Sequence, residues 1–264
     1  MSKEGIAMRR IITLMIGCFF LVFPTGCVKE KAAPQPAGQL TPQELFLFRQ
    51  VENPVLIDTM SEIECRDHRI PGSLCLACEE VTDKLPQLVQ DRDKPVVFYC
   101  ESERCYRGCL AATDAKKLGY KRVYMLAGGL PAWKGAGYDI ESAERIPRQP
   151  VQSLKPYQFE RWLDAKKDFL IVDIRSEEFF SDDHLQGAVN VPMYQLHRRY
   201  AEIPQDRTIV LVDQNGLRSS LAASYLVRKN FEKVVRLFGG MDAWDKFVAQ
   251  EEQKKKLKAG GSPT

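Results

Sequence analysis

The chain has few of the features that mark several common functional classes. Three of its 264 residues are histidines, and because they are isolated from one another we expect surface or helix-capping positions for them. The formal net charge is +3, with basic and acidic residues interleaved, so the sequence indicates no basic patch of a nucleic-acid-binding protein. The apolar run at 11–23 is too short to span a bilayer comfortably. The composition, 44% hydrophobic and 28% charged, is that of a folded soluble protein.

Residues 1–27 are predicted to be an export signal. Arg9 and Arg10 precede the apolar run, which ends at small residues. The junction PTGC at 24–27 resembles the lipobox of bacterial lipoproteins, in which the cysteine, here Cys27, is acylated and becomes the mature amino terminus. An uncleaved anchor helix is the alternative. We therefore expect the body of the protein outside the cytoplasm, anchored to the membrane through lipid and facing the periplasm or the cell exterior.

A long internal repeat organises the rest of the chain. Residues 107–133, RGCLAATDAKKLGYKRVYMLAGGLPAW, align without gaps to residues 218–244, RSSLAASYLVRKNFEKVVRLFGGMDAW. Shorter upstream segments pair in the same order, VLIDTMSE with LIVDIRSE and PVVFYC with TIVLVD. Each copy is long enough to bury its own core. The predicted order is a tether (28–42), a first copy (43–143), a Pro-rich linker (144–156), a second copy (157–250) and a charged tail (251–264).

Both copies alternate short β-branched apolar runs, such as VLID and TIVLV, with helical patterns such as LAATDAKKLG. Such runs are typical of buried parallel strands. Each copy is therefore predicted to be an α/β domain with a parallel sheet flanked by helices. In such folds ligands bind at the turn between the carboxyl end of a strand and the next helix. Cys100 is predicted to lie at that turn.

The ordered motifs of the two copies resemble the rhodanese sulfurtransferases. Asp-x-Arg-Ser at 173–176, His-Leu-x-Gly-Ala at 184–188, a loop ending in Arg218-Ser219 and a closing Gly-Gly-x-x-Ala-Trp follow in order. The resemblance covers both copies, from about residue 43 to 247. It implies tandem rhodanese-like domains in which a loop cysteine accepts a sulfane sulfur as a persulfide. The expected partners are a small sulfur-containing anion and a thiol acceptor, which includes a protein sulfur acceptor; no cofactor and no metal is expected.

Cys100 falls on the nucleophile position of that family. A thiol attacks as its thiolate, and backbone N–H groups at the start of a helix favour the anion. Arg107 is the candidate substrate-binding residue, with Arg104 as a second cation on the loop. A buried strand-end thiol without chemistry is the alternative for Cys100. Six residues separate Cys100 from Arg107, against four in the usual family loop, so the anion cradle is expected to differ in shape.

The second copy departs from the family at its nucleophile position. Asp213 stands there, and because a carboxylate cannot form a persulfide we expect this copy to be catalytically silent, with a scaffold or docking role. The first copy departs elsewhere: it has Met60 where the second has Arg175, and Arg69 where the second has His184.

The remaining cysteines all lie in the first copy. Beyond Cys18 and Cys27 they are Cys65, Cys75, Cys78, Cys100, Cys105 and Cys109. Six thiols allow 15 complete pairings. Cys105, on the same loop as Cys100, is the candidate resolving thiol. For the Cys75-x-x-Cys78 pair a disulfide or redox role is expected rather than a zinc site shared with Cys105 and Cys109, and the disulfide connectivity of the six thiols stays open.

The sequence therefore predicts a sulfurtransferase that moves sulfane sulfur from thiosulfate, polysulfide or a persulfide through Cys100. Two alternatives stay open. One is a thiol-disulfide redox module in which Cys100 and Cys105 cycle between dithiol and disulfide. The other is a non-catalytic binding protein with structural disulfides. The state of the thiols separates the three.

Overall fold

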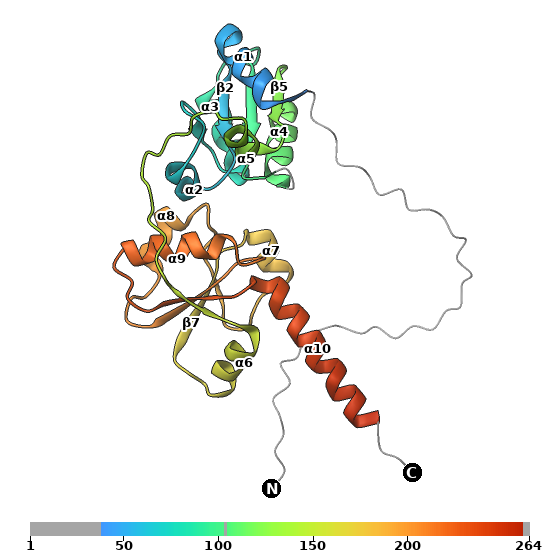
Figure 1. Cartoon of the computed structure of the whole chain (residues 1–264), viewed down its shortest axis with the longest axis vertical. Coiled ribbons are helices and arrows are strands. Elements are labelled where there is room, and N and C mark those ends of the chain that lie inside the picture. The colour runs from blue at the N-terminus through green and yellow to red at the C-terminus, as the bar shows by residue number, and fades with distance from the viewer. Residues whose placement is uncertain (1–37, 103–104, 261–264) are drawn as a thin grey trace, which may run out of the picture. The chain divides into compact units, whose positions relative to one another are not determined.

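The computed structural model describes residues 38–102 and 105–260, which belong to one compact unit. The first copy, coloured blue to green in Figure 1, forms a five-stranded sheet in the order β1-β5-β4-β2-β3. Its strands, all parallel, are β1 (Gln39–Leu40), β2 (Val55–Asp58), β3 (Leu74–Cys75), β4 (Val96–Tyr99) and β5 (Val123–Leu126). Its helices are α1 (Pro42–Glu52), α2 (Glu62–Asp67), the 3-10 turn η1 (Cys78–Glu80), α3 (Val81–Leu88), α4 (Tyr106–Lys117) and α5 (Gly129–Gly135).

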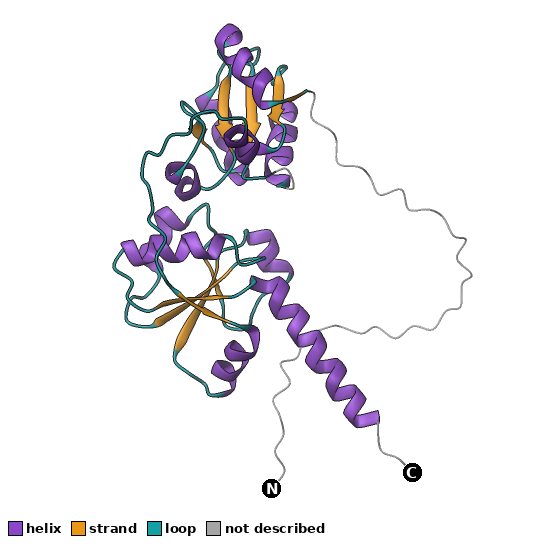
Figure 2. Cartoon of the chain, viewed as in Figure 1, coloured by secondary structure: helices purple, strands orange, loops and turns teal. Residues whose placement is uncertain are grey.

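The second copy repeats this topology with the sheet order β6-β10-β9-β7-β8. Its strands, again parallel, are β6 (Gln152–Leu154), β7 (Phe169–Asp173), β8 (Val189–Asn190), β9 (Thr208–Val212) and β10 (Val234–Leu237). Its helices are α6 (Pro156–Asp164), α7 (Glu177–Asp182), α8 (Leu196–Arg199), the 3-10 turn η2 (Tyr200–Glu202), α9 (Arg218–Arg228) and α10 (Gly240–Gly260). Both copies are parallel sheets with flanking helices (Figure 2), so the predicted fold class is confirmed.

Each sheet is buried on both faces. In the first copy one apolar cluster joins β4 to α3 and α4, and another joins it to α1 and α5. All four residues of β4 have no exposed surface, as expected of a central strand whose side chains alternate between two covered faces. The two tryptophans at matching repeat positions, Trp133 and Trp244, lie in the cores of the first and second copy.

The repeated Gly-Gly pair brings the start of a helix against each candidate loop. Gly129 has φ +60°, and a Cβ there would collide with the carbonyl oxygen of Cys100. That oxygen accepts a hydrogen bond from Leu130 N at 2.8 Å. Gly240 has the same relation to Asp213 in the second copy, with φ +58°. Glycine is needed because only it combines a left-handed backbone with this close approach.

Helix α2 links the two copies. It contacts α8 and α9, and its Ile63 is buried in the apolar cluster that surrounds α9. Ile146, from the linker, joins the same cluster. A residue on α2 can therefore touch both the first copy, to which it belongs, and the second.

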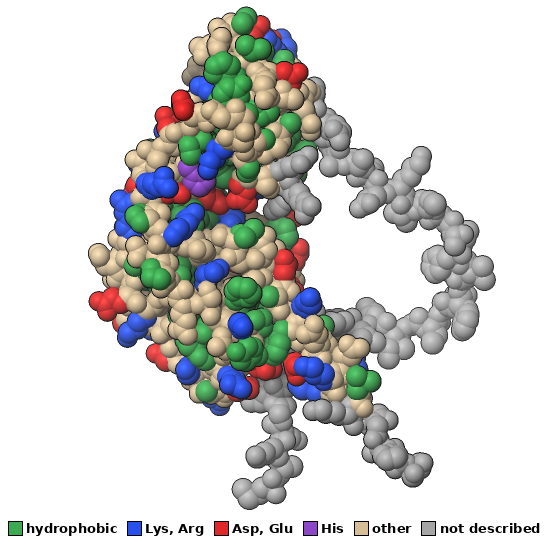
Figure 3. Space-filling model, in the orientation of Figure 1, with side chains coloured by type: hydrophobic (Ala, Val, Ile, Leu, Met, Phe, Trp, Pro, Cys, Tyr) green, Lys and Arg blue, Asp and Glu red, His purple; other side chains and the backbone are tan. Residues whose placement is uncertain are grey.

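The ends of the chain differ in what the structure describes. The export signal, with Cys27, and residues 28–37 of the predicted tether lie outside the described residues. At the other end, residues 251–260, expected to be a tail, continue helix α10. Among the helices of the described ranges, none combines the length and apolar character needed to cross a bilayer. Basic and acidic side chains are interspersed on the face drawn in Figure 3, in line with the small net charge.

Candidate active site

Cys100 directly follows β4, and helix α4 begins at Tyr106. The structure therefore brings Cys100 to the strand-to-helix turn where the sequence predicts it. Its side chain is buried, with 3% of the residue exposed. Its sulfur is bonded to that of Cys105, with the two Cα atoms 6.3 Å apart. The loop is thus in its oxidised form, and neither cysteine can act as a nucleophile until this bond is opened.

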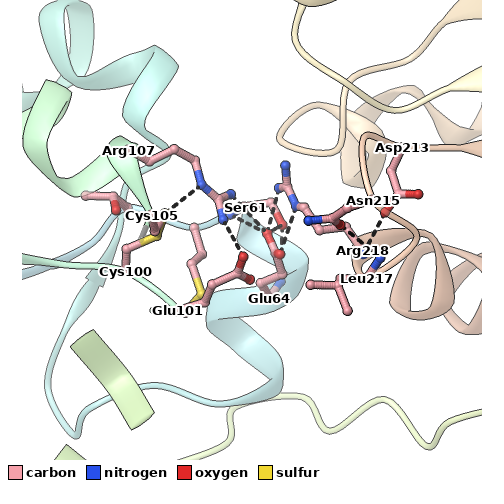
Figure 4. A network of polar contacts seen from close by, with 12 residues as sticks. Ser61, Glu64, Cys100, Glu101, Cys105, Arg107, Asp213, Asn215, Leu217 and Arg218 are labelled. Carbon is pink, nitrogen blue, oxygen red and sulfur yellow. Dashed lines mark hydrogen bonds and ion pairs between the residues drawn. A yellow bond between two sulfur atoms is a disulfide. The ribbon is translucent and has the colours of Figure 1, made fainter. Parts of the chain in front are cut away.

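Arg107, in the first turn of α4, points its guanidinium at the loop (Figure 4). The residue is 6% exposed. Its Nε donates a hydrogen bond to Cys105 Sγ at 3.3 Å. Its Nη2 lies 3.3 Å from Glu101 Oε1 and its Nη1 lies 3.7 Å from Glu64 Oε2. The predicted anion-binding arginine is therefore beside the cysteines, but two carboxylates share its charge.

Glu64 is the central residue of this network, and the sequence reasoning missed it. It sits in the first turn of α2, where Ser61 and Glu64 form a capping box. Ser61 Oγ donates to Glu64 Oε2 at 2.6 Å. Arg218 of the second copy donates Nε to Oε1 at 3.0 Å and Nη2 to Oε2 at 2.7 Å. Burial on its own would raise the pKa of Glu64, but the Arg218 and Arg107 guanidiniums outweigh it and hold the pKa well below its ordinary value.

The spacing Ser61-x-x-Glu64 was the only signal in the sequence that pointed to Glu64. That spacing predicts a helix cap. It cannot predict the pairing with Arg218, which lies 154 residues away along the chain. Glu101, the residue after Cys100, is 40% exposed at its side chain and was likewise missed.

The corresponding loop of the second copy holds its own carboxylate. Asp213 is 3% exposed. Its Oδ1 accepts a hydrogen bond from Gly216 N at 3.0 Å, and its Oδ2 accepts from Arg218 N at 2.8 Å and Ser219 N at 3.0 Å. Backbone donors at the start of a helix are the groups that would bind an anion. Here the Asp213 carboxylate accepts hydrogen bonds from these donors, so it occupies the position that an external anion would take.

Comparison with known proteins decides the family. The rhodanese-like domain matches residues 41–136 and again 155–247. The chain belongs to the rhodanese-like domain family. The match falls on both copies, so the resemblance predicted from the motifs is confirmed.

Individual relatives match over parts of the chain. A sulfurtransferase of Allochromatium vinosum is 36% identical over 78 residues, covering 30% of this chain and 73% of the relative. The thiosulfate sulfurtransferase GlpE of Shewanella oneidensis is 37% identical over 78 residues, with 30% and 77% covered. YrkF of Bacillus subtilis is 27% identical over 111 residues; the match covers 42% of this chain and little more than half, 57%, of YrkF.

Among solved structures, the thiosulfate sulfurtransferase from Pseudomonas aeruginosa aligns with a TM-score of 0.39 at 21% identity. The alignment covers 76% of this chain and 43% of that one.

The two cysteines of the Cys75-x-x-Cys78 pair differ in state: one is in a disulfide and the other is free. Cys75, for which a disulfide or redox role was expected, forms a disulfide, and its partner is Cys65, with Cα atoms 5.7 Å apart. Cys75 is on the edge strand β3, beside α2, whereas Cys78 turns into η1 and is buried against α4. Burial raises the pKa of the Cys78 thiol to about 12, so it stays protonated at neutral pH.

Cys109 is a free, partly exposed thiol on α4. Arg104 lies outside the described residues. Within the described ranges, no group of three or more His, Cys, Asp and Glu side chains that could hold a metal ion is found.

The substitution of Met60 for arginine leaves a buried carboxylate without its partner. In the second copy Arg175 pairs with Asp173. In the first copy Asp58 has no exposed surface, its Oδ1 accepts from Met60 N at 2.9 Å, and its Oδ2 has no hydrogen-bond partner. Burial raises the pKa of Asp58 to about 7. Arg69, the other departure, contacts Glu141 at 2.6 Å and donates to Cys75 Sγ at 3.3 Å.

Proposed function

We propose that this chain is a sulfurtransferase in which Cys100 carries sulfane sulfur and Cys105 controls when it can do so. The observation that carries the proposal is the arrangement at one loop: Cys100 at the carboxyl end of a buried strand, Arg107 in the following helix turn, and Cys105 bonded to Cys100. Membership of the rhodanese-like family and relatives named sulfurtransferases support the same activity.

The first step opens the loop. A thiolate of an external thiol or dithiol attacks the sulfur of Cys105, a partly exposed residue, the bond to Cys100 breaks, and Cys100 leaves with the electron pair as a thiolate. A second external thiol then attacks the mixed disulfide, which releases Cys105 and leaves the external pair oxidised. The positive end of α4 and the guanidinium of Arg107 favour the Cys100 thiolate.

The second step moves sulfur. The Cys100 thiolate attacks the sulfane sulfur of an anionic donor, such as thiosulfate, a polysulfide or a persulfide, and the rest of the donor leaves as sulfite or as a thiolate. A thiol acceptor, small or part of a protein, then attacks the outer sulfur of the Cys100 persulfide and regenerates the Cys100 thiolate. Arg107 binds the anionic donor, and the Glu64 and Glu101 carboxylates moderate its charge.

Cys105 supplies a second exit for the sulfur. Its thiolate attacks the inner sulfur of the Cys100 persulfide, which forms the Cys100–Cys105 disulfide and releases hydrosulfide. This step closes the loop again and returns the site to the oxidised form described above. Delivery to an acceptor and release as sulfide therefore compete.

A thiol-disulfide redox module is the second candidate function. The Cys100–Cys105 disulfide itself favours it, because Cys100 is buried whereas Cys105 is partly exposed, so an external dithiol would attack the bond from the Cys105 side. A protein of this kind would exchange electrons through the loop and accept no sulfur from a donor. The non-catalytic alternative would keep both disulfides closed as structural bonds.

We also propose that the mature protein is a lipoprotein that begins at acylated Cys27. The signal and junction motivate this, and two disulfides in one copy are typical of an oxidising compartment. Mass spectrometry of the amino-terminal peptide should find lipid on Cys27. An unmodified peptide that runs through Gly26 and Cys27 would contradict the proposal.

Two substitutions test which copy carries the activity. Cys100→Ser should abolish transfer of sulfur from thiosulfate to a thiol acceptor in reduced protein, because serine forms no persulfide. Asp213→Ala should retain most of it, since the second copy has no thiol. Turnover that survives Cys100→Ser would move the assignment to Cys105.

A further inference from the structure

Two arginines, each in the first turn of the helix that follows its copy's candidate loop, converge on the carboxylate of Glu64 (Figure 4). Arg218 makes a two-pronged contact, with donor-acceptor distances of 3.0 and 2.7 Å. Arg107 lies farther away, 3.7 Å from the nearer oxygen. A guanidinium that donates two parallel hydrogen bonds to a carboxylate forms the stronger kind of ion pair. Arg218 therefore forms the stronger ion pair with Glu64, and Arg107 forms a weaker one.

Because Arg218 pairs more closely with Glu64 than Arg107 does, the positive charge of Arg107 is only partly neutralised by Glu64. Besides Glu64, Arg107 faces Glu101, which is partly in water and whose charge is therefore screened. The Arg107 Nε remains directed at the Cys105 sulfur. Glu64 is 4% exposed, and a buried carboxylate that loses one cation will pair with whichever cation is left. Without Arg218, Glu64 would turn to Arg107 and neutralise it.

We propose that Arg218 is a positioning residue for the anion-binding loop of the first copy and that it acts through Glu64. By holding Glu64, it leaves the Arg107 guanidinium available to an anion at Cys100. The second copy's own loop is occupied by the Asp213 carboxylate. Through Arg218, this copy contributes to the anion-binding loop of the first copy. The anion is the sulfur donor if the proposed function holds, but the electrostatic effect on Cys100 exists without it.

The capping box keeps the Glu64 side chain at the start of α2 independently of either arginine. Ser61 donates its backbone N–H and its hydroxyl to Glu64 Oε2, at 3.0 and 2.6 Å. Replacement of Arg218 should therefore shift the carboxylate towards Arg107 by a short distance and leave α2 intact. This makes a change in charge, rather than a loss of fold, the expected effect.

Alkylation of Cys100 by a matched pair of reagents measures that charge. Iodoacetate is an anion and iodoacetamide is neutral, and both react with a thiolate, so the ratio of their rates reports the positive charge near the sulfur. The experiment uses the reduced full-length chain. Trypsin cleavage gives peptide 93–104, in which Cys100 is the one cysteine, and mass spectrometry of that peptide follows its modification.

We expect Arg218→Gln to lower the iodoacetate-to-iodoacetamide ratio about three- to tenfold, since it removes the charge that balances Glu64 near the loop. Glu64→Gln should raise the ratio by a similar factor. In the Glu64→Gln background, Arg218→Gln should change it less than twofold, because the carboxylate through which Arg218 acts is gone. Arg218→Lys should fall between wild type and Arg218→Gln, since lysine keeps the charge without the fork.

Arg207→Gln is the matched control. Arg207 also lies in the second copy and pairs with a carboxylate, that of Asp168. It directly precedes β9, whereas Arg218 follows that strand, so the two arginines lie at opposite ends of β9. The ratio of Arg207→Gln should equal that of wild type. A thermal melt checks that each variant is folded. If Arg218→Gln does not fold, the alkylation ratios of the other two variants decide: the inference requires a lower ratio than wild type in Arg218→Lys and a higher one in Glu64→Gln.

Two results would overturn the inference. One is an unchanged ratio in folded Arg218→Gln; the other is an equal fall with and without Glu64, which would mean that Arg218 acts directly through space. The test needs no sulfur transfer. A ratio that moves as expected in a protein without transfer would contradict the proposed function and support this inference. In an active protein, Arg218→Gln should also raise the KM for thiosulfate about as much as it lowers the ratio, with kcat changed less than twofold.

Discussion

Arg175 donates hydrogen bonds to both carboxylate oxygens of Asp173, at distances of 2.7 to 3.1 Å. The first copy keeps the aspartate, Asp58, but has Met60 in place of the arginine. The two copies therefore bury the same carboxylate in opposite electrostatic surroundings, one paired and one not. We therefore expect replacement of the two aspartates by asparagine to have opposite effects on the free energy of unfolding at neutral pH.

Asp58→Asn should stabilise the protein increasingly as the pH rises. The folded pKa of Asp58 is raised from 3.8 to about 7, so the folded state binds a proton that the unfolded state releases, and stability is lost between these two pH values. The gain over wild type should approach about 4 kcal/mol above pH 7 and vanish below pH 3.8. Urea unfolding at several pH values measures it.

Asp173→Asn is the control for that series. It leaves the buried Arg175 without its carboxylate, so at neutral pH it should lower the free energy of unfolding by roughly 3–5 kcal/mol. A difference between Asp58→Asn and wild type that stays constant with pH would contradict the account of Asp58.

The Cys65–Cys75 bond should act on stability and not on chemistry. Its sulfurs join residues 10 apart, and closing a loop of that size stabilises by about 3 kcal/mol in the chain-entropy account. Replacing both cysteines by serine should cost about that much while the reduced protein keeps its sulfur-transfer rate. Cys78→Ser, which breaks no disulfide, controls for the loss of a buried thiol. Loss of transfer in a folded double variant would give this bond a redox role.

Asp213→Ala should empty the anion cradle of the second copy. Three backbone N–H groups lose their acceptor, so we expect a loss of roughly 2–4 kcal/mol in the free energy of unfolding. Added sulfate should restore part of it, because an anion that binds the folded state alone stabilises it. Asn215→Ala removes an exposed acceptor of the same loop and should change stability by less than about 0.5 kcal/mol. A melting temperature of Asp213→Ala that does not respond to sulfate would show that the cradle does not bind anions.

The fold could be predicted because the repeat presents each strand and helix twice. Runs such as PVVFY and TIVLV predict buried parallel strands, and the order of motifs identifies the family. The position of Cys100 followed from the same logic, since ligands bind at the carboxyl ends of parallel strands. These features are local in sequence, and local patterns were sufficient to predict them.

The parts that the sequence did not predict depend on contacts between distant residues. Glu64 meets Arg218 only because α2 packs against α8 and α9. The partner of Cys75 is Cys65, on a helix beside β3, and nothing in the spacing of Cys75 and Cys78 shows that Cys78 turns the other way. Met60 was recognised as a departure from the family, but the unpaired carboxylate that it leaves at Asp58 emerged only from burial.

In the proposed function, Cys100 carries the sulfur and Cys105 resolves it. The most direct test is a single pulse of thiosulfate on the reduced full-length chain, followed by mass spectrometry of peptide 93–104. Wild type should gain one sulfur atom on this peptide and lose it within the time course, as sulfide is released and Cys100 becomes bonded to Cys105. In Cys105→Ser the added sulfur should accumulate until an external thiol is supplied, and in Cys100→Ser it should never appear. Equal persulfide occupancy and decay in wild type and Cys105→Ser would remove the resolving role, and no added sulfur in either protein would contradict sulfur transfer through Cys100.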